Sequence, residues 1–285
     1  MTAVLDPVTP LDQAPTVAPS GPSAPLLREA LVFARRRAAH IRQVPEKLFD
    51  VTIQPLMFVL LFAYVFGGAI GVDGGSYREY LVGGILIQSL AFGLAGPAAS
   101  IATDMTEGVI DRFRSLPVRR TAFLVGHCLA ELAGMVLATV LLLGAGLVVG
   151  WRAHSGIGEL ALSAVLVLAF ATAMVWMGTF LGLLVRTPDA VMGVVFPAVF
   201  PLTFVSNAFV PIDTLPNVLQ WAASLNPISV LVAAVRELWG NPVAPSPKDV
   251  WPMEHPVAAA FVYVAVLLAV AVPAAIGRYR RRTTG

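Results

Sequence analysis

The sequence is poor in charge. Charged residues occupy only 13% of its 285 positions, whereas apolar residues occupy 57%. Soluble domains carry about 25% charged residues, so this composition excludes the ordinary soluble globular class and indicates a helical membrane protein. The net charge of +2 gives no reason to expect a nucleic-acid partner.

Cysteine and lysine are also scarce, and each scarcity excludes a kind of site. The single cysteine, Cys128, leaves no disulfide framework and no CxxC metal motif, so we expect an inert packing residue. Lys47 and Lys248 are the only lysines, and no GxxxxGK[ST] phosphate-binding loop occurs. The chain is therefore not expected to be an enzyme or to carry a catalytic residue, metal or cofactor. Any ATP that drives it must be hydrolysed on another chain.

Long apolar runs are abundant instead. Six of them are each about 20 residues or more, which is long enough to cross a bilayer as a helix. We therefore predict an all-α membrane protein with six transmembrane helices in a domain covering 49–277. The predicted spans are 51–71, 79–103, 122–150, 159–185, 189–210 and 256–277.

The basic residues predict the orientation. If the N-terminus is cytoplasmic, the loops and tails on that side hold 15 of the 19 Lys and Arg residues. The four outside are Arg78, Arg152, Arg236 and Lys248. Both termini are thus expected in the cytoplasm. The proline-rich segment 1–25 is predicted to be a disordered tail, 26–48 an amphipathic helix at the membrane interface, and 278–285 a basic tail.

A charged stretch separates the second and third apolar runs. Asp104 with Glu107 resembles a capping box, and Pro117 disfavours helix before it, which predicts a helix over 104–117. Its apolar residues Val109, Phe113 and Leu116 follow the i, i+4, i+7 spacing of one helix face. A simple basic loop between two spans is the alternative interpretation.

The order of residues in this stretch is more specific than its composition. The segment EGVIDRFRSLPVRR closely resembles the cytoplasmic loop of ABC-2 type permeases, the membrane subunits of the daunorubicin-resistance class of ABC exporters. The resemblance implies that 104–117 is the coupling helix that sits in a groove of the ATPase subunit. The residues expected to couple to that subunit are Glu107, Gly108, Val109, Asp111, Arg112, Phe113, Arg114, Leu116 and Pro117.

Few polar residues interrupt the predicted spans. Glu131 lies in the third span with His127 one turn earlier, while Gln88 and Asn207 lie in the second and fifth. A carboxylate in a bilayer is costly, so Glu131 is a candidate for function. A structural hydrogen bond, at His127 or a neighbouring helix, is the other interpretation.

Prolines and glycines mark expected bends and contacts. Pro97 should bend the second span, and Pro197 with Pro201 should break or strongly kink the fifth. Gly178 and Gly182 have the GxxxG spacing that lets helices approach closely.

The segment 211–241 after the fifth span is too polar to cross the membrane and contains two short amphipathic helices. It matches an ABC-2 region that, by resemblance, forms an extracellular re-entrant hairpin over the pathway; a long loop is the alternative. Arg236 and Glu237 are expected to be an outer polar pair, and four tryptophans, at 151, 221, 239 and 251, an interfacial belt. The hairpin residues singled out are Pro211, Pro216, Trp221, Asn226, Pro227 and Arg236.

The resemblance implies a permease subunit in a bacterial plasma membrane. A homodimer, or a pair with a similar permease, would bind two ATPase subunits that hold ATP and Mg²⁺. The expected cargo is a hydrophobic or amphipathic drug or a lipid-like metabolite. Alternatives are export of a polysaccharide or lipid, although no aromatic stripe for sugar stacking is evident, and a proton-coupled carrier using Glu131 and His127. An intramembrane enzyme would need more polar residues at one depth.

Overall fold

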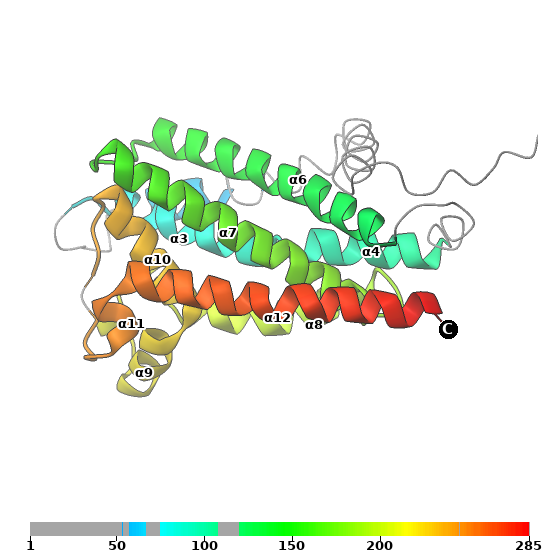
Figure 1. Ribbon diagram of the computed structural model, residues 1–285. Coiled ribbons are helices and arrows are strands. Elements are labelled where there is room, and N and C mark those ends of the chain that lie inside the picture. The colour runs from blue at the N-terminus through cyan, green and yellow to red at the C-terminus, as the bar shows by residue number, and fades with distance from the viewer. Residues whose placement is uncertain (1–52, 54–56, 67–74, 108–119, 245, 285) are drawn as a thin grey trace, which may run out of the picture.

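The computed structural model describes residues 53, 57–66, 75–107, 120–244 and 246–284, and the side chains of 120–122, 283 and 284 are not included. Every regular element among these residues is helical. Figure 1 shows an elongated bundle whose long helices run side by side. The elements are η1 (Phe62–Phe66, a π-helix), α3 (Tyr77–Phe92), α4 (Ala95–Thr106), α6 (Arg120–Val149), α7 (Ile157–Gly182), α8 (Ala190–Phe204), η2 (Ile212–Thr214), α9 (Asn217–Leu225), α10 (Pro227–Trp239), α11 (Trp251–Glu254) and α12 (Pro256–Thr284).

Four helical segments in the described ranges are long and apolar enough to cross a membrane. They are Tyr77–Thr106, Phe123–Val149, Ile157–Gly182 and Pro256–Arg282. The pair formed by α9 and α10 would make a fifth if it counted as one broken span. Nearly half of the predicted first span, and the segments 1–25 and 26–48, lie outside the described residues. The number six therefore stays a prediction.

The second predicted span is one membrane-crossing unit with a break in its middle. α3 ends at Phe92 and α4 begins at Ala95, so the chain bends at Gly93 and Leu94 rather than at Pro97 itself. The reason is that Pro97 has no N–H to bond the carbonyl four residues earlier, which belongs to Gly93. That carbonyl accepts from the N–H of Gly96 instead, at 3.3 Å.

Helix α7 lies at the centre of the bundle and contacts α3, α4, α6, α10 and α12. Its two predicted packing glycines meet backbone directly. A methyl group added at Gly178 would lie 2.2 Å from the Leu94 carbonyl oxygen, and one at Gly182 would lie 2.2 Å from that of Ala98. The GxxxG face is therefore the surface on which α7 packs against the break and the start of α4.

Helix α8 shows that the fifth span is not broken at its prolines, while a kink there stays a prediction. It continues without interruption through both Pro197 and Pro201. It then ends at Phe204, well before the predicted end at 210. Its 15 residues rise about 22 Å, which is less than the roughly 30 Å of a bilayer core. The irregular segment 205–210 follows it.

The predicted hairpin consists of two helices that differ in environment. α9 and α10 are bent by 69° relative to each other at Asn226. α10 is buried along nearly its whole length against α3, α7 and α12. α9 leaves the bundle, and Figure 1 shows it beside α11, at the end of the molecule opposite the C-terminus. Its re-entrant placement in a bilayer stays a prediction.

Arginine side chains bond backbone carbonyls at both ends of the bundle. At one end, the guanidinium of Arg282 near the end of α12 donates to the carbonyl of Val185, next to Arg186, at 3.4 Å. At the other end lie Arg78 and Arg152, whose guanidinium groups donate to carbonyls at the end of α6. The orientation inferred from the basic residues stays a prediction.

Candidate functional site

The predicted coupling stretch connects α4 with α6. Asp104 lies inside the last turn of α4, and Glu107 is the exposed residue that ends it, so the predicted capping box at 104–107 is wrong. The chain continues an existing helix here, and that helix already provides bonding partners for the local N–H groups. The other expected coupling residues, 108–117, lie outside the described residues. Their helix stays a prediction.

The most developed polar site lies at the opposite end of the same helices and centres on Arg236. This side chain, carried by α10, is fully buried. Its Nε donates to the Tyr80 carbonyl at 2.7 Å, Nη1 to that of Asn207 at 2.9 Å and Nη2 to that of Ala208 at 3.1 Å. Its guanidinium carbon also lies 3.3 Å from the centroid of the Tyr80 ring. One side chain therefore joins α10 to α3 and to the segment after α8.

This arrangement corrects the expected outer pair of Arg236 with Glu237. Successive residues on a helix point about 100° apart, so a buried position 236 leaves Glu237 on the exposed side. The ion pairs found among the described residues join His127 with Asp104 and His154 with Glu79. Arg236 instead binds carbonyl dipoles and an aromatic face, which is how an isolated buried cation can be stabilised.

The irregular segment after α8 has backbone carbonyl groups that need hydrogen-bond donors from elsewhere. Beyond Phe204 the carbonyl groups no longer have helical partners, and an unbonded carbonyl within a membrane is costly. The hydroxyl of Tyr80 donates to the Asn207 carbonyl at 2.8 Å, and that of Tyr77 donates to the Phe209 carbonyl at 3.0 Å. Buried Asn207 donates its own N–H to Ser229 Oγ at 3.2 Å. We call Tyr77, Tyr80, Asn207, Ser229 and Arg236 the Arg236 cluster.

Two glycines on α3 make room for the cluster. A methyl group at Gly84 would lie 1.9 Å from the Ala208 carbonyl oxygen, so no side chain fits there. One at Gly83 would lie 3.2 Å from Cγ of Arg236. Gly83 therefore lies beside the buried arginine side chain.

Asn226 connects the hairpin bend to the end of α8. Its Oδ1 accepts from the Ile228 N–H at 2.9 Å and so caps α10, which begins at Pro227. Its Nδ2 donates to the carbonyls of Leu202 and Val205, both at 2.6 Å. Pro211 and Pro216 start η2 and α9 in turn. Pro211 and Pro216 therefore come directly before a helix, and Pro227 is the first residue of one. Asn226 connects the bend between α9 and α10 to the end of α8.

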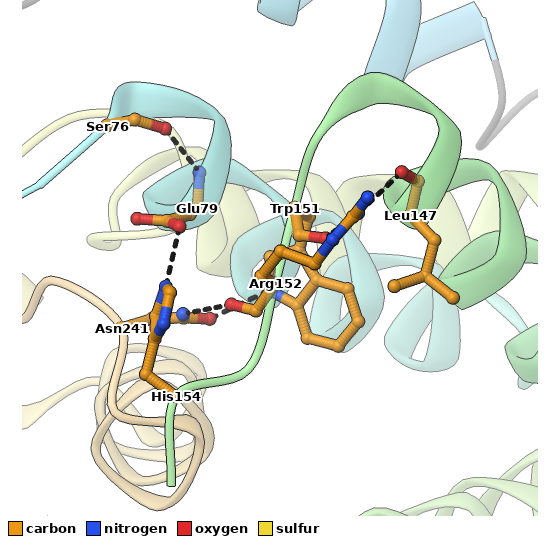
Figure 2. Close-up of polar contacts among 7 residues, drawn as sticks. All are labelled: Ser76, Glu79, Leu147, Trp151, Arg152, His154 and Asn241. Atoms are coloured by element: carbon orange, nitrogen blue, oxygen red, sulfur yellow. Dashed lines mark hydrogen bonds and ion pairs between the residues drawn. The ribbon is translucent and has the colours of Figure 1, made fainter.

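A second polar group at this end includes Glu79, His154 and Asn241, which the sequence analysis did not single out (Figure 2). Nε2 of His154 lies 2.8 Å from Oε1 of Glu79, and Nδ2 of Asn241 donates to the Arg152 carbonyl at 2.7 Å. Oδ1 of Asn241 accepts from the indole N–H of Trp151 at 2.7 Å. These bonds connect α3, the α6–α7 loop and the chain after α10. No motif in the sequence indicates them, because all three segments are distant along the chain.

The expected tryptophan belt is contradicted at two of its four positions and stays a prediction at the other two. Trp151 and Trp239 are buried and meet edge to face, with centroids 4.7 Å apart. They are packing residues that link the α6–α7 loop to α10. Trp221 and Trp251 are exposed, as a belt requires. The difference is that the first two find indole hydrogen-bond partners inside the protein.

The polar residues of the spans lie nearer the middle and the other end. His127 is buried, and its Nδ1 lies 3.9 Å from Oδ2 of Asp104 on α4. Glu131 is half-buried. Its carboxylate lies close to the start of α4, since a methyl group added at Gly96 would be 3.7 Å from its Oε2. Gln88 is buried in α3. In the described part of the chain no three His, Cys, Asp or Glu residues are grouped as metal ligands.

Helix α8 carries an aromatic row that the sequence reading overlooked. The rings of Phe196, Phe200 and Phe204 stack with centroids 4.8 and 4.2 Å apart, and all three are exposed. We call these the α8 aromatic row. Phe209 and Phe62 continue it towards the Arg236 cluster. The i, i+4, i+8 spacing in the sequence could have revealed this row.

Comparison with known proteins identifies the family of this chain. Residues 28–238 match the family model described as ABC-2 type transporter. The chain belongs to the ABC-2 type transporter family. The resemblance of the charged stretch is thereby confirmed, and the chain is a multi-pass membrane protein and the permease subunit of an ABC exporter.

Several relatives of this ABC-2 permease carry names that refer to drug resistance. It is 32% identical over 197 residues to the daunorubicin resistance ABC transporter permease protein DrrB1 of Streptomyces coeruleorubidus, covering 69% of this chain and 70% of that protein. It is 28% identical over 239 residues to the probable doxorubicin resistance ABC transporter permease protein DrrC of Mycobacterium tuberculosis (strain CDC 1551 / Oshkosh), covering 81% of each. A putative transport permease, ycf38, of Porphyra purpurea is 22% identical over 220 residues, 76% of this chain and 75% of that protein.

Proposed function

We propose that this permease exports a hydrophobic or amphipathic drug, or a lipid-like metabolite, from a bacterial cell. Two copies of the chain would form the pathway, and two ATPase subunits would bind ATP and Mg²⁺ and dock on 104–117. Both termini would lie in the cytoplasm, with the Arg236 cluster outside. The names of the relatives support the cargo class, and the low charge of the spans is consistent with it.

One observation supports the coupling mechanism most directly. The bent span Tyr77–Thr106 runs from the Arg236 cluster at one end to the coupling stretch at the other. Its break at Gly93 and Leu94 packs on the α7 glycines. A push on the loop after α4 would therefore reach the hydrogen-bonded outer end through a single element. Rigid helices with one defined bend are suited to transmit such a shift.

The direct test is whether an ATPase accompanies the chain. Purification from the native host should yield the permease with an ABC ATPase, and vesicles holding both should transport only with ATP. A proton-coupled carrier using Glu131 and His127 would instead transport on a proton gradient without the ATPase. Transport of that second kind would refute the proposal.

The α8 aromatic row supports a second candidate cargo. Phenylalanine rings stack on the faces of sugars as well as on flat drugs. Export of a polysaccharide or lipid therefore remains the alternative, and it predicts that an oligosaccharide competes with a flat drug in the same vesicles. If no sugar reduced transport of the drug, the result would support the drug-like cargo.

The orientation can be tested with thiols. In a Cys128→Ala background, a cysteine at Ile157 should react with an impermeant reagent from outside whole cells, because this side chain is 88% exposed at the α9 end. A cysteine at Ser115 should react only after the membrane is opened. Ile157 is a better reporter than Ser155, whose hydroxyl donates to the Leu238 carbonyl. The reverse labelling pattern would place the Arg236 cluster in the cytoplasm.

Two variants of Glu131 distinguish a structural role from a cargo-binding role. We expect a structural role, so Glu131→Gln should retain folding and export because it keeps the shape and hydrogen-bonding capacity. Glu131→Leu should lower the yield of folded protein. The measurement is export of one cationic and one neutral substrate by the Gln variant. Loss of the cationic substrate alone would make Glu131 a cargo contact.

A further inference from the structure

Asp104 and His127 lie opposite each other on the two helices that the coupling stretch connects. Asp104 is in the last turn of α4, and His127 is in the second turn of α6. Oδ2 of Asp104 lies 3.9 Å from Nδ1 of His127, which is within the range of an ion pair when the imidazole is protonated. The two residues therefore join the helix before the stretch to the helix after it.

This pair lies away from water. The side chain of His127 is fully buried, and that of Asp104 is 16% exposed. In a low-dielectric interior a polar group that loses its partner is costly, so such a pair favours the arrangement that keeps both groups together. Apolar contacts are not directional, whereas a buried polar pair selects one register between two helices. Asp104 and His127 therefore constrain how the end of α4 lies along α6.

The other polar side chains in the last turn of α4 are directed elsewhere. Oγ1 of Thr103 donates to the Ala99 carbonyl at 2.9 Å, and Oγ1 of Thr106 donates to the Thr103 carbonyl at 2.9 Å. Both hydroxyls thus bond their own helix, and Glu107 is exposed. In the described part of the chain, the polar contact from this turn to α6 is made by Asp104.

The start of α6 is itself attached to the rest of the bundle. Sγ of Cys128, next to His127, lies 3.6 Å from Oγ1 of Thr179 on the central helix α7. Phe123, one turn earlier, stacks on Tyr279 of α12, with ring centroids 6.4 Å apart. The pair therefore connects α4 to a helix that α7 and α12 already hold.

Helix α4 is thereby attached at both ends. At its start, the carbonyls of Leu94 and Ala98 lie against Gly178 and Gly182 of α7. At its last turn, Asp104 meets His127. A force on the coupling stretch then moves α4 and the start of α6 as one unit, instead of bending α4 alone at the break. Packed elements with two discrete arrangements are suited to transmit such a shift.

We propose that Asp104 and His127 are positioning residues for coupling. Their pairing keeps α4 and α6 in one register, so that movement of the coupling stretch reaches the bent span. The inference rests on the proposed function, because the ATPase subunits supply that movement. When the pair is broken, the ATPase still binds and hydrolyses ATP, but α4 slips along α6 and little cargo moves for each ATP.

Coupling is measured in vesicles that hold the permease and its ATPase, with daunorubicin as the transported probe. Asp104→Leu keeps a similar size and removes the polar group. Co-purification of the ATPase and ATP hydrolysis should stay close to native, while the probe exported per ATP should fall by about fivefold or more. If this variant gives too little folded permease, Asp104→Asn, which removes only the charge, takes its place with the same expectation. An unchanged ratio would overturn the proposal.

Two further variants separate positioning from simple loss of structure. Exchanging the partners, Asp104→His with His127→Asp, brings the same two groups together again and should recover most of the native ratio. Asp189→Asn removes an exposed carboxylate from the loop between α7 and α8, at the same end of the bundle, and should leave the ratio unchanged. An exchange variant that folds and binds the ATPase but stays as poorly coupled as Asp104→Leu would count against the pair.

A second measurement needs no ATPase, so it separates failure of this inference from failure of the proposed function. Spin labels at Thr106→Cys and Val140→Cys, both exposed, report the register of α4 along α6. The background is Cys128→Ser, and labelled permease is diluted with unlabelled permease. The native pair should give one narrow distance distribution, and Asp104→Leu a clearly wider one. Equal widths would overturn the proposal, whereas the expected widths together with ATPase-independent transport would refute the proposed function alone.

Discussion

Replacing Arg236 by alanine is expected to lower the free energy of unfolding by roughly 3–5 kcal/mol. The change leaves a large cavity in the buried face of α10 and removes the donors to three carbonyls around the end of α8. For a chain of this size such a loss lowers the unfolding midpoint by about 10 °C. Fluorescence-detected size-exclusion chromatography of heated samples in detergent measures it.

Two control variants make this prediction specific. Arg236→Lys keeps the charge but cannot reach three carbonyls with one ammonium, so its midpoint should fall between alanine and the native protein. Arg152→Ala removes an exposed arginine at the same end, which donates to the Leu147 carbonyl, and should cost little. If Arg236→Ala unfolded at the same temperature as Arg152→Ala, the Arg236 cluster would not hold this end together.

Replacing Phe113 by aspartate is expected to abolish ATP-driven export while leaving the yield of folded permease unchanged. In the predicted coupling helix Phe113 is the centre of the apolar face formed with Val109 and Leu116. Burying an unpaired carboxylate in an apolar interface costs several kcal/mol, and about 1.4 kcal/mol corresponds to a tenfold loss of affinity. The ATPase should therefore no longer co-purify.

The matched control for Phe113 adds the same charge elsewhere in the stretch. Ser115 lies about 200° away on a helical wheel, so Ser115→Asp should reduce co-purification far less. Complex yield and export are measured together for both variants. Normal complex formation and normal efflux by Phe113→Asp would show that this face does not contact the ATPase.

The sequence predicted those features that depend on residue type and local order. Apolar runs placed α6, α7 and α12 close to their observed bounds, because a helix in lipid needs a long run without charge. The ordered motif at 107–117 led to the family that the comparison confirmed. Asn226 and Pro227 were selected as a joint, and they do form the cap and first residue of α10.

Other predictions were wrong because the rest of the chain overrode a local preference. Pro197 and Pro201 each remove a backbone donor, yet α8 passes through both. Asp104 looked like the start of a helix but ends the preceding one. In each case the local rule describes a preference of about 1–3 kcal/mol, which tertiary contacts can exceed.

By itself, the sequence determined the membrane class, the positions of most long helices and the family. Only the tertiary structure decided what Arg236 does, because its three acceptors belong to residues 80, 207 and 208, and no local pattern connects them. It also decided that Gly84 must be glycine, since the Ala208 carbonyl occupies the space of a side chain. Helix formation in lipid depends on neighbours within one turn, whereas the pairing of buried polar groups depends on which segments meet in space.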